Sequence, residues 1–195
     1  MRNQKNLNTT TFSIFLLLIM LGSSSGCGRG ESNVTTGNRN GILHFGNGTD
    51  PQELDPHIVT GIPEHHILTA LLEGLVAKDP KTLEPIPGVA KEWRISKDKK
   101  IYTFTIRDDA LWSNGDPLTA HDFVWSWWRA LQPKLGNQYA YMLFPIRNSE
   151  AYTKGKIIDF SQVGVKALDD LTLVVTLENP TPYFLQLLDH YSMFP

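Results

Sequence analysis

The sequence has little of several features that commonly identify a class of protein. It holds one cysteine, Cys27, which excludes an intramolecular disulfide. The net charge is −2, and the only basic cluster is Lys97, Lys99 and Lys100, so nothing indicates a nucleic-acid partner. A Gly-rich phosphate loop, an HExxH metal motif and a nucleophile elbow are all missing from it. We therefore expect no catalytic residues, no metal site and no cofactor.

No hydrophobic run is long enough for a transmembrane helix, but the N-terminal region has the layout of a secretory signal. Arg2 and Lys5 precede a largely apolar run at residues 12–21, which is too short to span a bilayer. Small residues at 22–26 then lead directly into Cys27. This arrangement resembles a bacterial lipoprotein signal. We expect a signal peptide at residues 1–26 and lipidation of Cys27, with ordinary cleavage and a free thiol as the alternative.

The next segment is poor in apolar residues. Residues 28–41 are mainly Gly, Asn, Ser and Thr, which cannot bury a core, so residues 27–41 are expected to form a flexible tether. A flexible segment of this length spans roughly 20 Å root-mean-square. Residues 42–46 alternate in polarity and are expected to be the first strand.

The remainder has ordinary globular composition, and its clearest unit lies at residues 101–133. Tyr102, Phe104 and Ile106 alternate with polar residues, which predicts a strand with one buried face. Thr119 and Asp122 have the spacing of a capping box at the start of a helix. That helix has apolar residues at helical spacing and ends before Pro133: Phe123, Val124, Trp127, Trp128 and Leu131.

Weaker patterns predict the other elements. A helix is expected from Pro63, ended by Gly74, with an apolar stripe of Ile67, Leu68, Leu71, Leu72 and Leu75. Residues 79–88 are too rich in proline for a regular element, residues 89–93 suit one helical turn, and residues 94–96 a strand. A short helix at 149–155, a hairpin of strands 163–167 and 171–177, and a helix after Thr181 complete the chain.

Some polar residues invite a chemical interpretation that their context does not favour. The adjacent His65 and His66 point about 100° apart on a helix, so structural or solvent-facing roles are favoured over a metal site. His57 is expected to form hydrogen bonds within its loop. The carboxylate pairs at 108–109 and 169–170 lie at the ends of strands, where Asp binds the local backbone, so we expect turns.

Three tryptophans on the predicted helix could form a sugar-stacking platform. Trp127 and Trp128 fall on the apolar stripe and are expected in the core, whereas Trp125 is the one expected to be exposed.

Several phrases together resemble one family, the extracytoplasmic solute-binding proteins of oligopeptide and dipeptide ABC importers (family 5 type). The similarity covers residues 42–195 and rests on six phrases in order: GTDPQELDPH at 48–57, EGL at 73–75, PGVAKEW at 87–93, YTFTIR at 102–107, WSNGDPLTAHDFV at 112–124 and VKALDD at 165–170.

The resemblance implies an α/β, two-lobed periplasmic-binding-protein-like fold with an extra small α+β domain, closing around its ligand by a hinge. Residues 42–75 would start the first lobe, residues 76–179 would form the extra domain, and residues 180–195 would return to the first lobe. Because members are usually much longer, we expect this chain to be the N-terminal portion of a longer protein.

The resemblance also implies a site. In the family the ligand lies extended and pairs with protein backbone, which recognises peptides through groups that all of them share. The matching residues are Thr60, Gly61 and Ile62, with Tyr139 as an aromatic of the cleft. Thr60 stands where several members have an acidic residue, which puts a preference for basic ligand side chains in doubt.

We therefore expect a monomeric substrate-binding subunit, not an enzyme, that captures oligopeptides and delivers them to the permease subunits of an ABC importer. It would lie in the periplasm or at the outer face of the cytoplasmic membrane, held by its lipid anchor. The alternatives are the same fold binding a nickel chelate, haem or a murein peptide, or acting as a non-transporting sensor lipoprotein. An extracellular hydrolase is disfavoured because no pair of catalytic groups is evident.

Overall fold

The computed structural model describes residues 30–195, so the expected signal peptide and Cys27 lie outside the described residues. The chain divides into two compact units, Met1–Gly46 and Asn47–Pro195. The subdivision of the second unit at residues 75 and 179 stays a prediction.

The described part of the first unit contains helix α2 (Asn33–Asn40). The Ser32 hydroxyl accepts a hydrogen bond from the Thr35 amide at its start, and Gly41 ends it in the left-handed conformation. The segment expected to be a flexible tether is therefore helical at residues 33–40, with capping residues at both helix ends, and its role as a tether stays a prediction. The expected strand at 42–46 is also wrong, since those residues form no strand.

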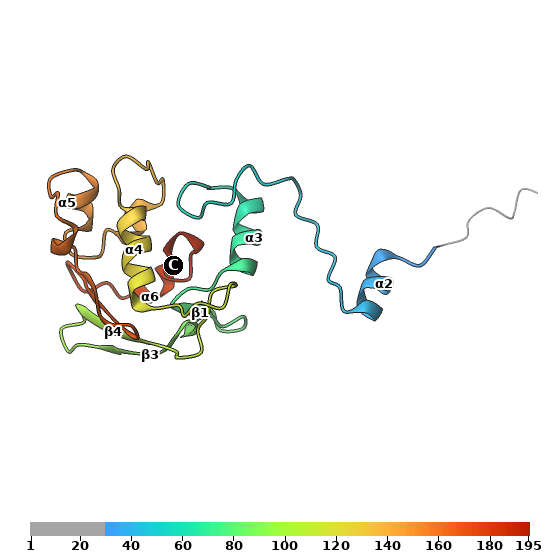
Figure 1. Ribbon diagram of the computed structural model, residues 1–195, viewed down its shortest axis with the longest axis horizontal. Coiled ribbons are helices and arrows are strands. Elements are labelled where there is room, and N and C mark those ends of the chain that lie inside the picture. Colours follow the sequence, from blue (N-terminus) through green and yellow to red (C-terminus); the bar gives the residue numbers. More distant parts are fainter. Residues whose placement is uncertain (1–29) are drawn as a thin grey trace, which may run out of the picture. The chain divides into compact units, whose positions relative to one another are not determined.

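The second unit is built on a four-stranded antiparallel sheet with the order β3-β4-β6-β5 (Figure 1). Its strands are β3 (Ala90–Ile95), β4 (Ile101–Ile106), β5 (Val165–Asp169) and β6 (Thr172–Thr176). The alternation predicted for β4 is confirmed, because Tyr102, Phe104 and Ile106 are all buried. Phe104 lies opposite Leu173 of β6, and both are fully buried. The predicted hairpin of β5 and β6 is confirmed as well.

Helix α4 (Ala120–Ala130) packs on one face of this sheet and contacts β5 and β6. Its predicted capping box is present. The Asp122 carboxylate accepts hydrogen bonds from the Thr119 amide (2.7 Å) and the Thr119 hydroxyl (2.9 Å). Phe123 and Trp127 are fully buried in the core, which forms between this helix and the sheet.

Only part of the expected aromatic stripe is buried. Trp127 is fully buried and Trp125 is 59% exposed, as predicted, but Trp128 is 38% exposed. The assignment of Trp128 to the core is therefore wrong. Consecutive helical residues point about 100° apart, so a narrow contact with the sheet buries one of two neighbouring indoles.

Helix α3 (Ile62–Leu71) begins one residue before the predicted Pro63 and ends before Leu72. Its apolar stripe is only partly correct, because Leu68 is buried and Leu71 is 69% exposed. Gly74 does not end the helix. A Cβ there would lie 2.4 Å from the Phe194 ring, so glycine is required by close packing of the two segments.

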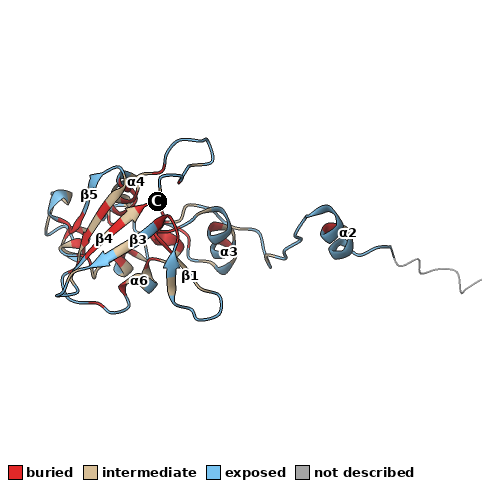
Figure 2. Cartoon of the chain, turned by 90° about the horizontal axis from the view of Figure 1, so that it is seen from below, coloured by how far each residue is buried: buried red, intermediate tan, exposed pale blue. Residues whose placement is uncertain are grey.

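Two loop predictions are wrong. Within residues 79–88 the segment Pro85–Pro87 forms β2, which pairs with β1 (Val76–Lys78) in a two-stranded sheet. The helical turn expected at residues 89–93 is instead the start of β3, an edge strand that is mostly exposed (Figure 2). The strand predicted at residues 94–96 is confirmed for Arg94 and Ile95, which end β3, but its first residues were missed because the burial of β3 has no period of two.

The remaining elements are short. They are the 3₁₀ helices η1 (Ala140–Leu143), η2 (Phe160–Gln162) and η3 (Tyr191–Met193) and the α-helices α5 (Ser149–Thr153) and α6 (Phe184–Leu187). The helices expected at 149–155 and after Thr181 are thus present, the second one shorter than expected. Turn η3 contacts both α3 and α4, and so brings the last residues of the chain beside them (Figure 1).

Candidate functional site

The predicted ligand-binding residues Thr60, Gly61 and Ile62 lie where the loop enters helix α3. Gly61 precedes the helix with an extended backbone (φ −82°, ψ 154°), and Ile62 is its first residue. Thr60 is exposed and Ile62 is 70% exposed, whereas Val59 immediately before them is buried. The segment therefore has a buried residue at Val59, followed by exposed Thr60, partly exposed Gly61 and exposed Ile62.

The main-chain carbonyls of this segment already have partners. The Tyr191 hydroxyl donates to the Val59 carbonyl (2.8 Å), and the Tyr139 hydroxyl donates a long hydrogen bond to the Thr60 carbonyl (3.4 Å). The Gly61 carbonyl accepts from the His65 amide (3.0 Å) within the first turn of α3.

The amides of the same segment are not paired in this way. Among the described residues, the N–H groups of Thr60, Gly61 and Ile62 have no hydrogen-bond partner. An amide at the start of a helix has no intrahelical acceptor. Three consecutive donors are thus available to a ligand that presents carbonyl or carboxylate oxygens.

A cavity of about 450 Å³ adjoins this segment. Its lining combines loop residues with the start of α3 and one residue next to Tyr139: Gln52, Glu53, Ile58, Val59, Thr60, Gly61, Glu64 and Gln138. Glu64 is buried, and its carboxylate accepts a hydrogen bond from the Gln52 amide (2.8 Å). A Cβ on Gly61 would lie 2.0 Å from a carboxylate oxygen of Glu64, so a larger residue at position 61 would require the Glu64 side chain to move from its present place.

A second cavity, of about 430 Å³, is lined by Asp108, Asp169 and Asp170 among other residues. None of the predicted ligand-binding residues lines it. The turn prediction for Asp169 is confirmed, because its carboxylate accepts from the Leu171 amide (2.9 Å). The turn predicted at residues 108–109 is present as well, closed by the hydrogen bond from the Ala110 amide to the Arg107 carbonyl (3.3 Å), and the Asp109 carboxylate also pairs with Arg107 (3.2 Å).

Tyr139, the fourth predicted residue, belongs to an aromatic cluster beside the loop. Its ring meets His190 edge-on at 4.7 Å and Tyr191 at 6.1 Å, measured between ring centroids. Burial lowers the pKa of His190 to about 4 and raises the pKa of Tyr191 to about 12. At neutral pH both groups are therefore uncharged, and the Tyr191 hydroxyl keeps the proton that it donates to the loop. The structure thus brings Tyr139 next to Thr60, although 79 positions separate them.

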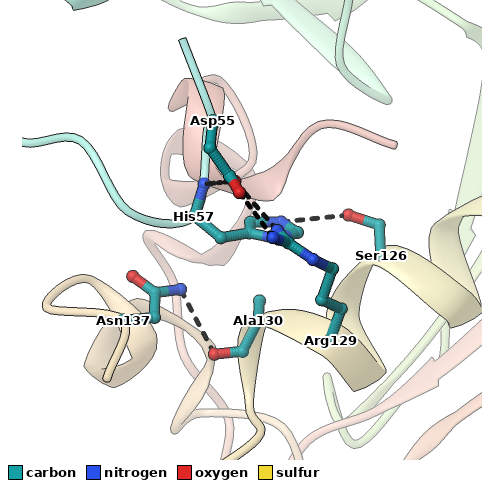
Figure 3. A network of polar contacts seen from close by, with 6 residues as sticks. All are labelled: Asp55, His57, Ser126, Arg129, Ala130 and Asn137. Atoms are coloured by element: carbon teal, nitrogen blue, oxygen red, sulfur yellow. Dashed lines mark hydrogen bonds and ion pairs between the residues drawn. The ribbon is translucent and has the colours of Figure 1, made fainter. Parts of the chain in front are cut away.

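A polar network joins the loop before α3 to helix α4, as Figure 3 shows. The Arg129 guanidinium, on α4, donates hydrogen bonds to both carboxylate oxygens of Asp55, one of them at 2.8 Å. It also donates to Nδ1 of His57 (2.8 Å). The Arg129 hydrogen bond is the main reason that the pKa of Asp55 lies below its usual value. His57 was expected to form hydrogen bonds in its loop; its amide does so with the Asp55 carboxylate (3.0 Å), whereas its ring binds side chains of α4.

The network continues to the C-terminal segment. The Ser126 hydroxyl lies 3.2 Å from Nε2 of His57 and donates to the Phe194 carbonyl (2.6 Å). His57 and Ser126 are 3% and 1% exposed. Sequence reasoning missed Asp55, Ser126 and Arg129. Asp55 carried a weak local signal, because it lies two residues before His57 and accepts from its amide (3.0 Å).

The structure bears on the disfavoured chemistry as well. Among residues 30–195, no group of three or more His, Cys, Asp or Glu side chains is arranged to hold a metal ion. His65 contacts the rings of His66, His190 and Tyr191, in keeping with the structural role expected for it.

No helix in the described part of the chain is both long enough and apolar enough to cross a bilayer.

Comparison with known proteins gives a consistent result. The profile described as "Bacterial extracellular solute-binding proteins, family 5 Middle" matches residues 84–195. The chain is 46% identical over 151 residues to the periplasmic oligopeptide-binding protein OppA of Salmonella typhimurium, covering 76% of this chain and 27% of that protein. It is 43% identical over 154 residues to the dipeptide-binding protein DppE of Bacillus subtilis, covering 79% of this chain and 28% of that protein.

Solved structures agree with these relatives. OppA of Haemophilus influenzae, in complex with the peptide RPPGFSPFR, superposes with a TM-score of 0.72 at 43% identity. That match covers 76% of this chain and 29% of the solved one. The unliganded, open form of the murein tripeptide-binding protein MppA gives a TM-score of 0.70 at 42% identity, over 74% of this chain and 28% of that one. The chain therefore spans under a third of the length of these relatives.

Proposed function

The chain belongs to the bacterial extracellular solute-binding proteins of family 5. We propose that it is part of the substrate-binding subunit of an ABC importer and captures extended oligopeptides. The observation that supports this best is that the amides of Thr60, Gly61 and Ile62 have no acceptor among the described residues, while Thr60 and Gly61 line the cavity of about 450 Å³. Such donors bind the carbonyl oxygens of a peptide backbone, which are the same for every peptide sequence.

Tyr139 completes this site by forming part of its wall. Its ring lies beside Tyr191 and its hydroxyl reaches the Thr60 carbonyl, so it holds the loop and borders the ligand at the same time. The loop donates hydrogen bonds through its amides, while its carbonyls stay with the tyrosines and with His65.

The location and partners follow from the same proposal. The protein works outside the cytoplasmic membrane, in the periplasm or at its outer face, where a lipid on Cys27 holds it near the permease subunits that receive the peptide. It acts as a monomer and carries out no chemistry of its own.

A murein peptide is the second candidate ligand. It is favoured by the 42% identity over 148 residues to the periplasmic murein peptide-binding protein MppA of Escherichia coli. A murein tripeptide offers the same backbone acceptors, so the two candidates differ in the ligand and share the site.

Isothermal titration calorimetry on the full-length protein tests the proposal. The protein is titrated with a mixture of tripeptides and tetrapeptides and, in a separate experiment, with a murein tripeptide. Heat from the mixture supports oligopeptide capture. No heat from the mixture, together with tight binding of a metal complex or a sugar, contradicts it.

One substitution tests the amide donors directly. Ile62→Pro removes one N–H group, and proline is well tolerated at the first position of a helix, so the fold should be preserved. The peptide dissociation constant should rise about tenfold, because one ligand oxygen loses its donor. Ile62→Val keeps the N–H group and serves as the control. Equal affinities of the two variants would show that this amide does not bind the ligand.

A further inference from the structure

The polar network behind the loop joins three segments that are far apart in the sequence. Asp55 and His57 come from the loop before α3, and Ser126 and Arg129 come from α4 (Figure 3). The Phe194 carbonyl comes from the residue after η3. The side chains of Arg129 and Asp55 are 27% and 20% exposed, so the ion pair is shielded from water. Partly buried charges of this kind are stabilising only when they stay paired.

The hydrogen bonds of the network run in one direction. A guanidinium can only donate, so Nδ1 of His57 must be an acceptor and the ring must carry its proton on Nε2. The Ser126 hydroxyl donates to the Phe194 carbonyl, and its oxygen is therefore free to accept from Nε2 of His57. The network is thus satisfied by one neutral tautomer of His57.

The network reaches the proposed peptide-binding amides through Val59. The carbonyl of Asp55 accepts hydrogen bonds from the amides of Ile58 (3.1 Å) and Val59 (3.2 Å). Asp55 therefore binds Arg129 through its side chain and Val59 through its main chain. On its other side, the Val59 carbonyl is bound by Tyr191 of η3. Thr60 follows directly, so any shift of this anchor moves the three amides.

We propose that Asp55, His57 and Arg129 are positioning residues, which fix the Val59 anchor to α4 and thereby hold the amides of residues 60–62 in the geometry that binds a peptide. This rests on the proposed function. Asp55, His57 and Arg129 do not contact the peptide in this proposal. They fix the position of the loop, and the peptide binds to the amides of residues 60–62. Protonation of His57 would turn Nδ1 into a second donor facing Arg129, and the anchor would be released.

The groups that face His57 support this. Arg129 faces it from α4 and Asp55 from its own loop, while Ser126 is its neutral neighbour and in turn binds the Phe194 carbonyl. Glu53 acts on Arg129 from a greater distance. Burial first, and then the charge of Arg129, lower the pKa of His57 to about 4 against the opposing effect of Asp55. The neutral tautomer therefore persists throughout the neutral range.

Two variants of His57 separate positioning from simple folding. His57→Gln keeps an acceptor for Arg129 and a donor for Ser126 on one uncharged amide, whereas His57→Leu removes both. His121→Leu makes the same chemical change at an exposed position of α4 and is the matched control. Peptide affinity is measured by calorimetry on the protein as the cell makes it, with the tripeptide and tetrapeptide mixture.

At pH 7 we expect His57→Leu to weaken peptide binding by about tenfold or more, as for a lost buried hydrogen bond, with rescue by His57→Gln. The affinity of the wild type relative to His57→Gln should be about halved where the pH equals the pKa of His57, near 4, and should fall further below it, because only the neutral fraction is competent. Parallel pH profiles of the wild type and His57→Gln would overturn the proposal even if His57→Leu fails to fold.

A readout without ligand distinguishes this inference from the proposed function. Hydrogen exchange of the Val59 amide should be at least about tenfold faster in His57→Leu than in His57→Gln, the wild type or His121→Leu. Unchanged exchange overturns positioning whether or not peptides bind. Faster exchange in a protein that binds no peptide supports the anchor and refutes the peptide-binding role of the loop.

Discussion

Trp127 offers the sharpest test of how α4 holds the C-terminal segment in place. Its indole is fully buried, and its Nε1–H group donates to the Met193 carbonyl (2.9 Å) of η3. Trp127→Phe removes that donor while keeping an aromatic ring in the core. Turn η3 also carries Tyr191, which binds the Val59 carbonyl, and it is followed directly by Phe194, whose carbonyl binds Ser126, so the contact bears on the site as well as on stability.

The expected loss has two parts. Leaving the Met193 carbonyl buried without its donor costs about 1–3 kcal/mol. The smaller ring leaves a void of roughly 40 Å³, which costs about 1 kcal/mol at about 24 cal/mol per Å³. We therefore expect the free energy of unfolding to fall by about 2–4 kcal/mol.

Trp128→Phe is the matched control, because it makes the same change one residue later, at a side chain that is 38% exposed. Its effect should stay within about 0.5 kcal/mol. Both variants are unfolded in urea and followed by far-UV circular dichroism, which does not depend on tryptophan fluorescence, and an unchanged m-value shows that the same surface is exposed. Equal losses in the two variants, or a loss below about 1 kcal/mol at Trp127, would refute this account of the core.

Two further predictions concern pH and the membrane. The pKa of His57 and that of His190 are lowered from 6.5 to about 4 in the folded protein, so the unfolded state binds more protons between these values. The free energy of unfolding, measured in urea from pH 7 to pH 4.5, should fall as the pH drops below about 6.5, with His57 contributing at most about 3 kcal/mol. His57→Gln should show a shallower slope, and a flat profile in the wild type would contradict the burial of these rings. Cys27→Ser should release the protein from membranes in cell fractionation, and a variant that stays in the membrane fraction would rule out the lipid anchor.

The elements that sequence reasoning predicted correctly have local causes. The alternation of β4 repeats every two residues, so its buried face was visible from Tyr102, Phe104 and Ile106 alone. The spacing of Thr119 and Asp122 predicted the start of α4, because a capping box is completed within one helical turn. The six ordered phrases identified the family, and the comparisons confirm that identification.

The elements that were missed depend on distant partners. Only the end of strand β3, at Arg94 and Ile95, was predicted; its first residues pair with the edge that β4 offers, and they are mostly exposed with no period of two. The choice between Trp127 and Trp128 for the core depends on which side of α4 meets the sheet, and neighbouring apolar residues do not reveal this.

The candidate site divides in the same way. Its position at Thr60, Gly61 and Ile62 came from the family phrases, and the sequence alone also determined that a proline follows them at the start of a helix. Only the tertiary structure decided that the loop carbonyls are bound by Tyr139 and Tyr191 while its amides stay available. The same holds for the pairing of Asp55 with Arg129, which lies 74 positions away. The physical reason is that a hydrogen bond depends on distance in space, and residues so far apart in the chain meet only once the core between α4 and the sheet has packed.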